Sequence, residues 1–299
     1  MRYFILRISI FAFVFFFLIT ASYFLSDWFI NYRKQYFLKL RNNIVVVFAG
    51  DSNIECAVND NIIANSLNIA EGGEAYLYTY VKLKSLLKYN KQISTIILGF
   101  SFHTLDTTYQ NKWLYSDNFV IAKNKSYNYL LEKPEKSLIF SKNQKSYLQG
   151  IRDCTVENTI TIARSFFSNN LSNFGGYLYL NRDKLYENIK MYDSAAQPVF
   201  SFQVGKNQMK YLTLISDLCK QKRIQLILLN APKHSSYTNS FNYNINDYGV
   251  EISRLLNNDS LLDLSRMKLP DSCYADKTHL NYRGAKIFSE FLNEKINSH

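Results

Sequence analysis

The sequence contains little glycine, proline or cysteine, with 10 Gly, 4 Pro and 4 Cys in 299 residues. So little glycine and proline excludes a collagen-like or low-complexity chain. No two cysteines form a Cys-x-x-Cys pair, which argues against a zinc site of the usual spacing and against a thioredoxin-like redox site. The sequence leaves open whether the cysteines form disulfides or lie in the core as small apolar side chains.

Acidic residues are also scarce: 24 Asp and Glu face 35 Lys and Arg, which gives a formal net charge of +11. A basic chain favours anionic partners such as nucleic acid, a membrane surface or an acidic polymer. The basic residues are scattered, however, and no RNA- or DNA-binding motif is present. We therefore expect a solvated basic surface and no nucleic-acid partner.

Only one apolar run is long enough to cross a bilayer. Residues 8–25 read ISIFAFVFFFLITASYFL without a charge, which just meets the length of a membrane-spanning helix. Arg2 and Arg7 precede the run, and Trp28 and Tyr32 follow it where an aromatic belt would lie. The short basic N-terminus predicts a single-pass protein whose body lies on the extracytoplasmic side, periplasmic or outer.

Two observations compete with that prediction. A cleaved signal peptide also begins with basic residues and an apolar run, but this run is long and no small-x-small site follows it, which favours an uncleaved anchor. A basic cluster just after the run weakens the predicted orientation (Arg33, Lys34, Lys39 and Arg41). We expect a membrane anchor over residues 1–30, a juxtamembrane linker over 31–43 and one domain over 44–299.

The body alternates between buried strands and amphipathic helices. Continuous apolar runs at 44–49, 94–99 and 224–230 are typical of central strands in a parallel sheet, and shorter strands are expected at 68–70 and 261–264. Helical spacing predicts helices over 60–67, 74–89, 209–223 and 282–296. This alternation predicts an α/β domain with a mostly parallel sheet.

The stretch 102–203 interrupts this alternation. It is rich in Tyr, Asn and Lys and has no clear central strand, so we expect an insertion with helices of its own beside the sheet. Sites in open parallel sheets lie beyond the carboxyl ends of the strands. That edge should bring together residues 50–52, 99–103 and 230–234.

Candidate chemistry begins with Gly50-Asp51-Ser52, which directly follows the first strand. The triplet could be only a turn, or it could present a nucleophilic hydroxyl at the edge of the sheet. Near the C-terminus, Asp276 and His279 lie three residues apart before the last helix, where they could also be a simple surface turn. A nucleophilic serine needs a base, and the base needs a carboxylate that fixes its tautomer. We therefore predict Ser52 as nucleophile, His279 as base and Asp276 as the partner that orients it, with Asn281 or Thr278 capping the last helix.

Together these two motifs resemble the SGNH (GDSL-type) hydrolase superfamily, over residues 44–296 apart from the middle insertion. The resemblance implies a three-layer α/β/α, flavodoxin-like fold. It also implies ester hydrolysis or acyl transfer with Ser52, His279 and Asp276 in the roles given above, and without a metal or other cofactor.

The resemblance also implies an oxyanion hole, which this chain matches only in part. The family uses the N–H of the serine, a glycine N–H from a second block and an Asn side chain from a third. The stretch from Asn68 to Gly73 resembles the second block, so Gly73 or Gly72 would donate. The third block reads Gly-Phe-Ser and lacks the Asn, so Ser101, Asn68 or a residue of the insertion would have to replace it. Loss of one such donor costs roughly a hundredfold or more in rate.

Two further histidines follow strand ends. His103 is more often a polar loop residue than a catalytic one at such a position, whereas His234, with Lys233 beside it, could contact the substrate. The scattered histidines have no metal-ligand spacing, so we expect no metal site.

The anchor makes the chain similar to extracytoplasmic members of the superfamily that move acyl groups on cell-envelope polymers, such as the D-alanyl transfer protein of lipoteichoic acid synthesis and the alginate O-acetylation proteins. Such members often work with a membrane-bound O-acyltransferase, which is the candidate partner here. The expected function is hydrolysis or transfer of acyl esters on a cell-envelope glycan, with an acylated glycan or another acyl donor as substrate. The alternative is an inactive module that binds polysaccharide or the membrane acyltransferase, and the missing Asn favours it.

Overall fold

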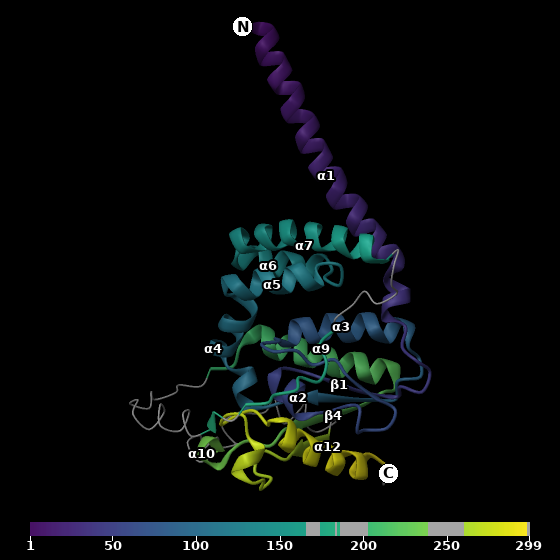
Figure 1. The fold of residues 1–299 in the computed structure, drawn as a ribbon, viewed down its shortest axis with the longest axis vertical. Coiled ribbons are helices and arrows are strands. Elements are labelled where there is room, and N and C mark those ends of the chain that lie inside the picture. Colours follow the sequence, from purple (N-terminus) through teal and green to yellow (C-terminus); the bar gives the residue numbers. More distant parts are fainter. Residues whose placement is uncertain (166–173, 183, 186–202, 239–259, 298–299) are drawn as a thin grey trace. The chain divides into compact units, whose positions relative to one another are not determined.

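The structure is a computed structural model that describes residues 1–165, 174–182, 184–185, 203–238 and 260–297. The chain forms two compact units (Figure 1). The first comprises Met1–Lys39 and Ser116–Ser172, and the second comprises Leu40–Tyr115 and Asn173–His299. The chain therefore leaves the second unit once and returns to it.

A five-stranded, all-parallel sheet forms the centre of the second unit. Its strands are β1 (Val46–Ala49), β2 (Ser66–Asn68), β3 (Thr95–Gly99), β4 (Gln225–Asn230) and β5 (Ser260–Asp263), in the order β2-β1-β3-β4-β5. This is the strand order of flavodoxin-like folds. The predicted α/β class with a parallel sheet is confirmed.

Helices cover both faces of this sheet. On one face, α3 (Tyr76–Tyr89) packs against α9 (Lys206–Lys222), and on the other, α2 (Ser52–Ala57) packs against α12 (Tyr282–Asn297), as Figure 1 shows. Ile54 of α2 and Phe288 of α12 are fully buried in one core cluster with strand residues such as Phe48. Because both faces are covered, the central strands are apolar on both sides, as their continuous apolar runs predicted.

The predicted strands agree with the observed ones to within about two residues, but the helix expected over 60–67 is wrong. Residues 60–65 form turns that lead into β2. Two polar side chains compete with the helical hydrogen bonds here. Asn59 Oδ1 accepts from the N–H of Asn61, and Asp60 Oδ2 accepts from the N–H of Asn68. Asn65 then takes a left-handed conformation (φ 56°), which ends any helical path.

The first unit consists of α1 (Arg2–Leu38), α5 (Asp117–Tyr127), α6 (Lys133–Lys142) and α7 (Gln144–Ser165). Helix α7 packs against α5 and against α1. Helix α1 continues beyond residue 30 into the stretch expected to be a linker, and the Lys34 ammonium donates to the carbonyl of Tyr129. Its apolar part is long enough to span a membrane. The side of the membrane on which the body lies stays a prediction.

The stretch between β3 and β4 supplies helices to both units. A 3-10 turn (Phe102–Leu105), α4 (Thr107–Gln110) and a π-helical turn (Asn111–Tyr115) belong to the second unit, and α5 to α7 belong to the first. Residues 174–182 rejoin the second unit as a segment without regular secondary structure, in which Gly176 N–H donates to Ala70 O and Leu178 N–H donates to Glu55 O. The rest of the expected insertion lies outside the described residues.

All four cysteines are buried and none forms a disulfide. The sequence left open whether the cysteines form disulfides or lie in the core as small apolar side chains, and in the structure they are buried free thiols.

A buried ion pair holds the loop between β2 and α3. The Lys82 ammonium contacts the Glu74 carboxylate at 2.6 Å, and both side chains are completely buried. Lys82 also donates to the carbonyls of Ile69 and Phe174, and Thr79 donates to the second oxygen of Glu74. One cation thus ties α3, the end of β2 and the returning segment together.

We predict that Lys82→Met lowers the free energy of unfolding of the second unit by about 3–5 kcal/mol, because it leaves a buried carboxylate without its cation. The measurement is urea unfolding of the full chain in detergent, followed by fluorescence in a Trp28→Phe background, where Trp113 is the sole tryptophan. The matched control is Lys286→Met, which removes an exposed lysine 4.0 Å from Glu290 and should cost less than about 1 kcal/mol. Equal unfolding midpoints for the two variants would contradict a structural role for the buried pair.

Candidate active site

The turn after β1 does two things at once. Gly50 has φ +139°, a conformation that favours glycine. A Cβ atom on Gly50 would also lie only 3.0 Å from Cα of Gly99 in the neighbouring strand. Asp51 then caps α2 by accepting the N–H of Asn53 at 3.0 Å. Ser52 is therefore the first residue of α2, at the carboxyl edge of the sheet. The triplet is both a turn and a presentation of the Ser52 hydroxyl.

Gly99 makes room for this turn. A Cβ atom on Gly99 would lie 2.5 Å from Cγ1 of Ile54, the buried residue of α2 that anchors the helix in the core. The small residue at the end of β3 thus allows α2 to approach the sheet closely, and this approach sets the position of Ser52.

Ser52, His279 and Asp276 form a continuous hydrogen-bonded chain. His279 Nε2 lies 2.8 Å from Ser52 Oγ, and His279 Nδ1 lies 2.9 and 3.0 Å from the two carboxylate oxygens of Asp276. A carboxylate on Nδ1 favours the tautomer with its proton there, because the carboxylate accepts only. Nε2 is then the acceptor for the serine O–H. The three predicted residues, up to 227 positions apart in the chain, meet at hydrogen-bonding distance.

Asp276 is held as a charged carboxylate. Burial by itself would raise its pKa, but the hydrogen bonds and charge of His279, together with the hydrogen bonds from Thr278, outweigh burial and keep the pKa well below its usual range. The backbone N–H groups of Thr278 and His279 both donate to Oδ1, at 2.9 and 3.0 Å. Asp276 therefore remains ionised at neutral pH.

Arg182 is a cationic neighbour of Asp276 that the sequence did not indicate. Its guanidinium lies 3.2 Å from Oδ2 of Asp276, and its side chain is about half exposed. It comes from the segment 174–182, which has no regular secondary structure, and the nearby Lys184 donates its N–H to the carbonyl of Ala275. No sequence motif indicates this arginine, because its contact with Asp276 depends on how residues 174–182 pack against the rest of the second unit.

The loop that carries Asp276 and His279 is fixed at both ends. Ala275 N–H donates to His279 O at 2.9 Å, which closes the loop as a tight hairpin. Asn281 caps α12 by accepting the N–H groups of Arg283 and Gly284, and its amide donates to the carbonyls of Ser272 and Tyr274. The predicted cap at Asn281 is confirmed, and it holds the imidazole in place relative to α12.

Candidate oxyanion donors lie on two neighbouring loops. Glu71 N–H donates to Gly50 O at 3.0 Å, which joins the loop containing Gly72 and Gly73 to the turn before Ser52. Gly73 has φ +63°, and within the described residues neither glycine N–H donates a hydrogen bond. The N–H of Ser52 stands at the first position of α2, where N–H groups have no partner within the helix. All three N–H groups are therefore available to a ligand.

The side-chain amide of Asn68, in contrast, already uses its N–H donors within the protein. It is 1% exposed, and its amide N–H groups donate to the carbonyls of Val58 and Ile54 while its Oδ1 accepts from Ala70 N–H. Its side chain therefore holds α2 and β2 together, and the function proposed below does not use it.

Ser101 is paired with His103 in the position of the third block. Ser101 Oγ lies 2.8 Å from His103 Nδ1, and both follow the end of β3. Burial first, and then the charge of Lys233, lower the pKa of His103 to about 4, with a smaller contribution from His279 and an opposing one from Asp51. His103 is therefore neutral at physiological pH and close enough to the triad to respond to its charge. The sequence had favoured a loop role for it.

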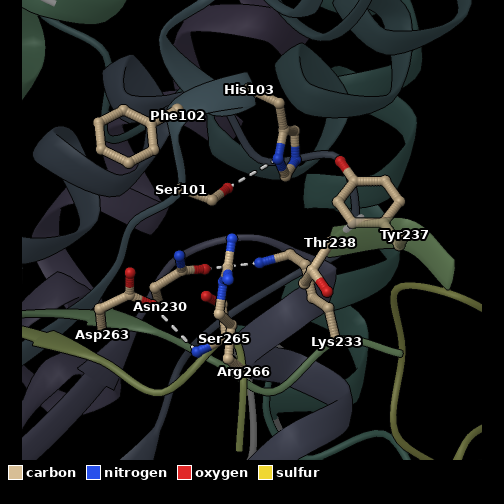
Figure 2. Close-up of a pocket in the computed structure, with 10 residues that line it drawn as sticks. All are labelled: Ser101, Phe102, His103, Asn230, Lys233, Tyr237, Thr238, Asp263, Ser265 and Arg266. Carbon is tan, nitrogen blue, oxygen red and sulfur yellow. Dashed lines mark hydrogen bonds between the residues drawn. The ribbon is translucent and has the colours of Figure 1, made fainter. Parts of the chain in front are cut away.

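A pocket of about 200 Å³ adjoins Ser101 and His103 at the carboxyl edge of the sheet. Its walls follow β3, β4 and β5, with Ser101 and His103 facing Asn230 and Lys233 across it in Figure 2. The remaining lining residues are Phe102, Tyr237, Thr238, Asp263, Ser265 and Arg266.

His234 does not line this pocket. Its Nδ1 lies 2.7 Å from Ser236 Oγ and its Nε2 lies 3.3 Å from Asp271, so its ring is held by short polar contacts in the loop after β4. The neighbouring Lys233 reaches the pocket instead. Among the described residues, no group of three or more His, Cys, Asp or Glu side chains could hold a metal ion.

Comparison with known proteins does not identify a family or an activity for this chain. A family model whose description names no activity matches residues 194–299, less than half of the chain. No curated protein matches. Among solved structures, the chain is similar to a proposed acylhydrolase from Bacteroides fragilis, with 13% identity, a TM-score of 0.37, and coverage of 87% of this chain and 89% of that one. With so low a score, this likeness carries no argument about activity.

We predict that the imidazole of His103 does not titrate between about pH 5.5 and 8, and that Lys233→Met raises its pKa, because removal of a nearby cation makes protonation easier. The measurement is ¹⁵N NMR of the histidine rings in the full chain in detergent, where only four histidines contribute signals and His103→Gln assigns the resonance.

The control is Lys268→Met, an exposed lysine after β5 that does not line the pocket. If His103 titrates near its ordinary pKa of about 6.5, or if both lysine variants shift it equally, the proximity of Lys233 and His103 is wrong.

Proposed function

We propose that this protein is a membrane-anchored SGNH-type serine esterase or O-acyltransferase. The observation that supports the proposal most strongly is the Ser52–His279–Asp276 chain of hydrogen bonds at the carboxyl edge of a sheet with flavodoxin-like order. A hydroxyl, an imidazole and a carboxylate in this arrangement are what nucleophilic acyl transfer requires.

In the proposed reaction, Ser52 Oγ attacks the acyl carbonyl carbon while His279 Nε2 takes the hydroxyl proton. Asp276 stabilises the imidazolium that forms. The tetrahedral intermediate collapses when the ester C–O bond breaks, and the leaving alcohol takes the proton from His279. The acyl group on Ser52 then passes to water or to a sugar hydroxyl, with His279 again acting as base.

The N–H groups of Ser52 and Gly73, or of its neighbour Gly72, would hold the oxyanion. The Ser101–His103 pair supplies the third donor in place of the missing Asn in this proposal. The pair stands where the third block ends, Ser101 is buried, and the neutral imidazole of His103 can donate from one ring nitrogen.

The proposed setting is the outer side of the membrane, with α1 as the anchor. The proposed substrate is an acyl ester on a cell-envelope glycan, and the proposed partner is a membrane-bound O-acyltransferase. The apolar helix supports the anchor, and the net charge of +11 is suited to an anionic polymer.

We predict that the full chain in detergent hydrolyses p-nitrophenyl acetate and that Ser52→Ala abolishes turnover. Asp276→Asn should lower kcat about a thousandfold or more, because the neutral amide no longer favours the correct tautomer or stabilises the imidazolium. Intact mass spectrometry should show one acetyl or fluorophosphonate adduct on wild type and none on Ser52→Ala.

The matched control is Ser141→Ala, which removes an exposed serine in α6 and should leave turnover and labelling unchanged. A folded wild-type chain with neither turnover nor adduct, also in the presence of the membrane acyltransferase, would overturn the enzyme and favour the module that binds polysaccharide. Equal labelling of wild type and Ser52→Ala would show that another residue is the nucleophile.

A further inference from the structure

The pocket beside the candidate triad contains a buried cation with a single hydrogen-bond acceptor. Lys233 is 4% exposed, and its ammonium donates to Asn230 Oδ1 at 2.6 Å. Within the described residues, no carboxylate lies within 4.0 Å of this ammonium, and the ammonium donates no other hydrogen bond. A buried charge is costly unless it is paired, and an ammonium has three donors. The Lys233 ammonium therefore has N–H groups left that can donate to a ligand in the pocket.

A second cation lines the same pocket. Arg266 follows β5, and its guanidinium makes no hydrogen bond or ion pair with any described part of the chain. The carboxylate of Asp263 also lines the pocket, with Oδ1 accepting the N–H of Ser265 at 3.0 Å. Because His103 is neutral, the lining carries two cations and one carboxylate, which leaves one net positive charge.

The pocket lies within reach of the ester that Ser52 would attack. In the sheet, β3 separates β1, which leads to Ser52, from β4, which leads to Lys233. Two strand spacings are roughly 10 Å. The loops are also joined directly, because His234 N–H donates to Lys277 O at 3.0 Å and the Tyr274 hydroxyl donates to Lys233 O at 3.4 Å. Two parts of one substrate can thus occupy the pocket and the position beside Ser52.

We infer that this pocket binds a carboxylate of the substrate through Lys233 and Arg266, with Asn230 and Ser101 as polar neighbours. One net positive charge matches a monoanion, and a planar guanidinium suits the two oxygens of a carboxylate. The volume of about 200 Å³ accommodates one such group with its immediate neighbours. The carboxylate would be carried either by a sugar acid of the glycan or by the free end of a dicarboxylic acyl group. Its position beside the reacting ester rests on the proposed function.

Binding is tested first without catalysis, in the full-length Ser52→Ala chain in detergent, by isothermal titration calorimetry. D-galacturonate is compared with D-galactose, and monomethyl succinate with methyl butyrate, so each carboxylate has a neutral partner. We expect one of the two carboxylates to bind at least tenfold more tightly than its neutral partner, and the pair that responds identifies the source. Adding Lys233→Met or Arg266→Gln to Ser52→Ala should remove at least tenfold of that affinity, whereas Lys268→Met should not change it.

Arg266 is exposed, so Arg266→Gln remains informative if Lys233→Met fails to fold, which Trp113 fluorescence in the Trp28→Phe background would reveal. Equal affinity for the charged and neutral partners of both pairs would overturn the inference, as would tighter binding of inorganic phosphate than of either carboxylate.

Catalysis is tested separately with wild type on p-nitrophenyl hemisuccinate and p-nitrophenyl acetate. If monomethyl succinate is the ligand, the ratio of the two kcat/KM values should favour the hemisuccinate and fall at least tenfold in Lys233→Met. Carboxylate binding with neither hydrolysis of either ester nor an adduct on Ser52, also in the presence of the membrane acyltransferase, would support the binding pocket and contradict the proposed reaction. Hydrolysis without any preference for carboxylates in binding would support the proposed reaction and contradict carboxylate binding in the pocket.

Discussion

The parallel direction of all five strands is the constraint on which the candidate site depends. Because the strands run the same way, every loop that follows a strand leaves at one edge of the sheet. Ser52 follows β1, Ser101 and His103 follow β3, Lys233 follows β4, and Arg266 follows β5. An antiparallel sheet of the same strands would divide these side chains between two edges. The strand order then sets the distance between the candidate nucleophile and the basic pocket.

Close packing around α2 turns this arrangement into a defined geometry. Two glycines at the ends of adjacent strands allow Ile54 to pack against the sheet, and Asp51 caps the helix that begins at Ser52. On the other side, α12 packs against α2 and carries the capped loop that presents His279. The 2.8 Å contact between Ser52 and His279 is therefore supported by the core and by helix caps rather than by the two side chains alone.

Charge is distributed unevenly around the candidate site. Asp276 is ionised and accepts several hydrogen bonds, while burial and the charge of Lys233 keep His103 neutral. Burial lowers the pKa of Lys233 to about 8, and the carboxylates of Asp51 and Asp263 oppose that decrease. An anionic group in the pocket would oppose it further, since a negative charge nearby favours the protonated amine. A chain with a net charge of +11 thus places a buried lysine after β4, two strands away from the strand that leads to the candidate nucleophile.

The sequence by itself determined the class of fold and the candidate triad. Continuous apolar runs mark the central strands, because strands covered on both faces need apolar side chains throughout. One short motif after the first strand marks Ser52, and another before the last helix marks Asp276 and His279. It misjudged 60–67, where Asn59 and Asp60 form local hydrogen bonds that replace a helix. Only the tertiary structure decided that the Asn68 amide donates to backbone carbonyls and that Arg182 contacts Asp276. It also decided that Lys233, and not His234, lines the pocket. These outcomes depend on contacts between residues far apart in the chain, which no local pattern encodes.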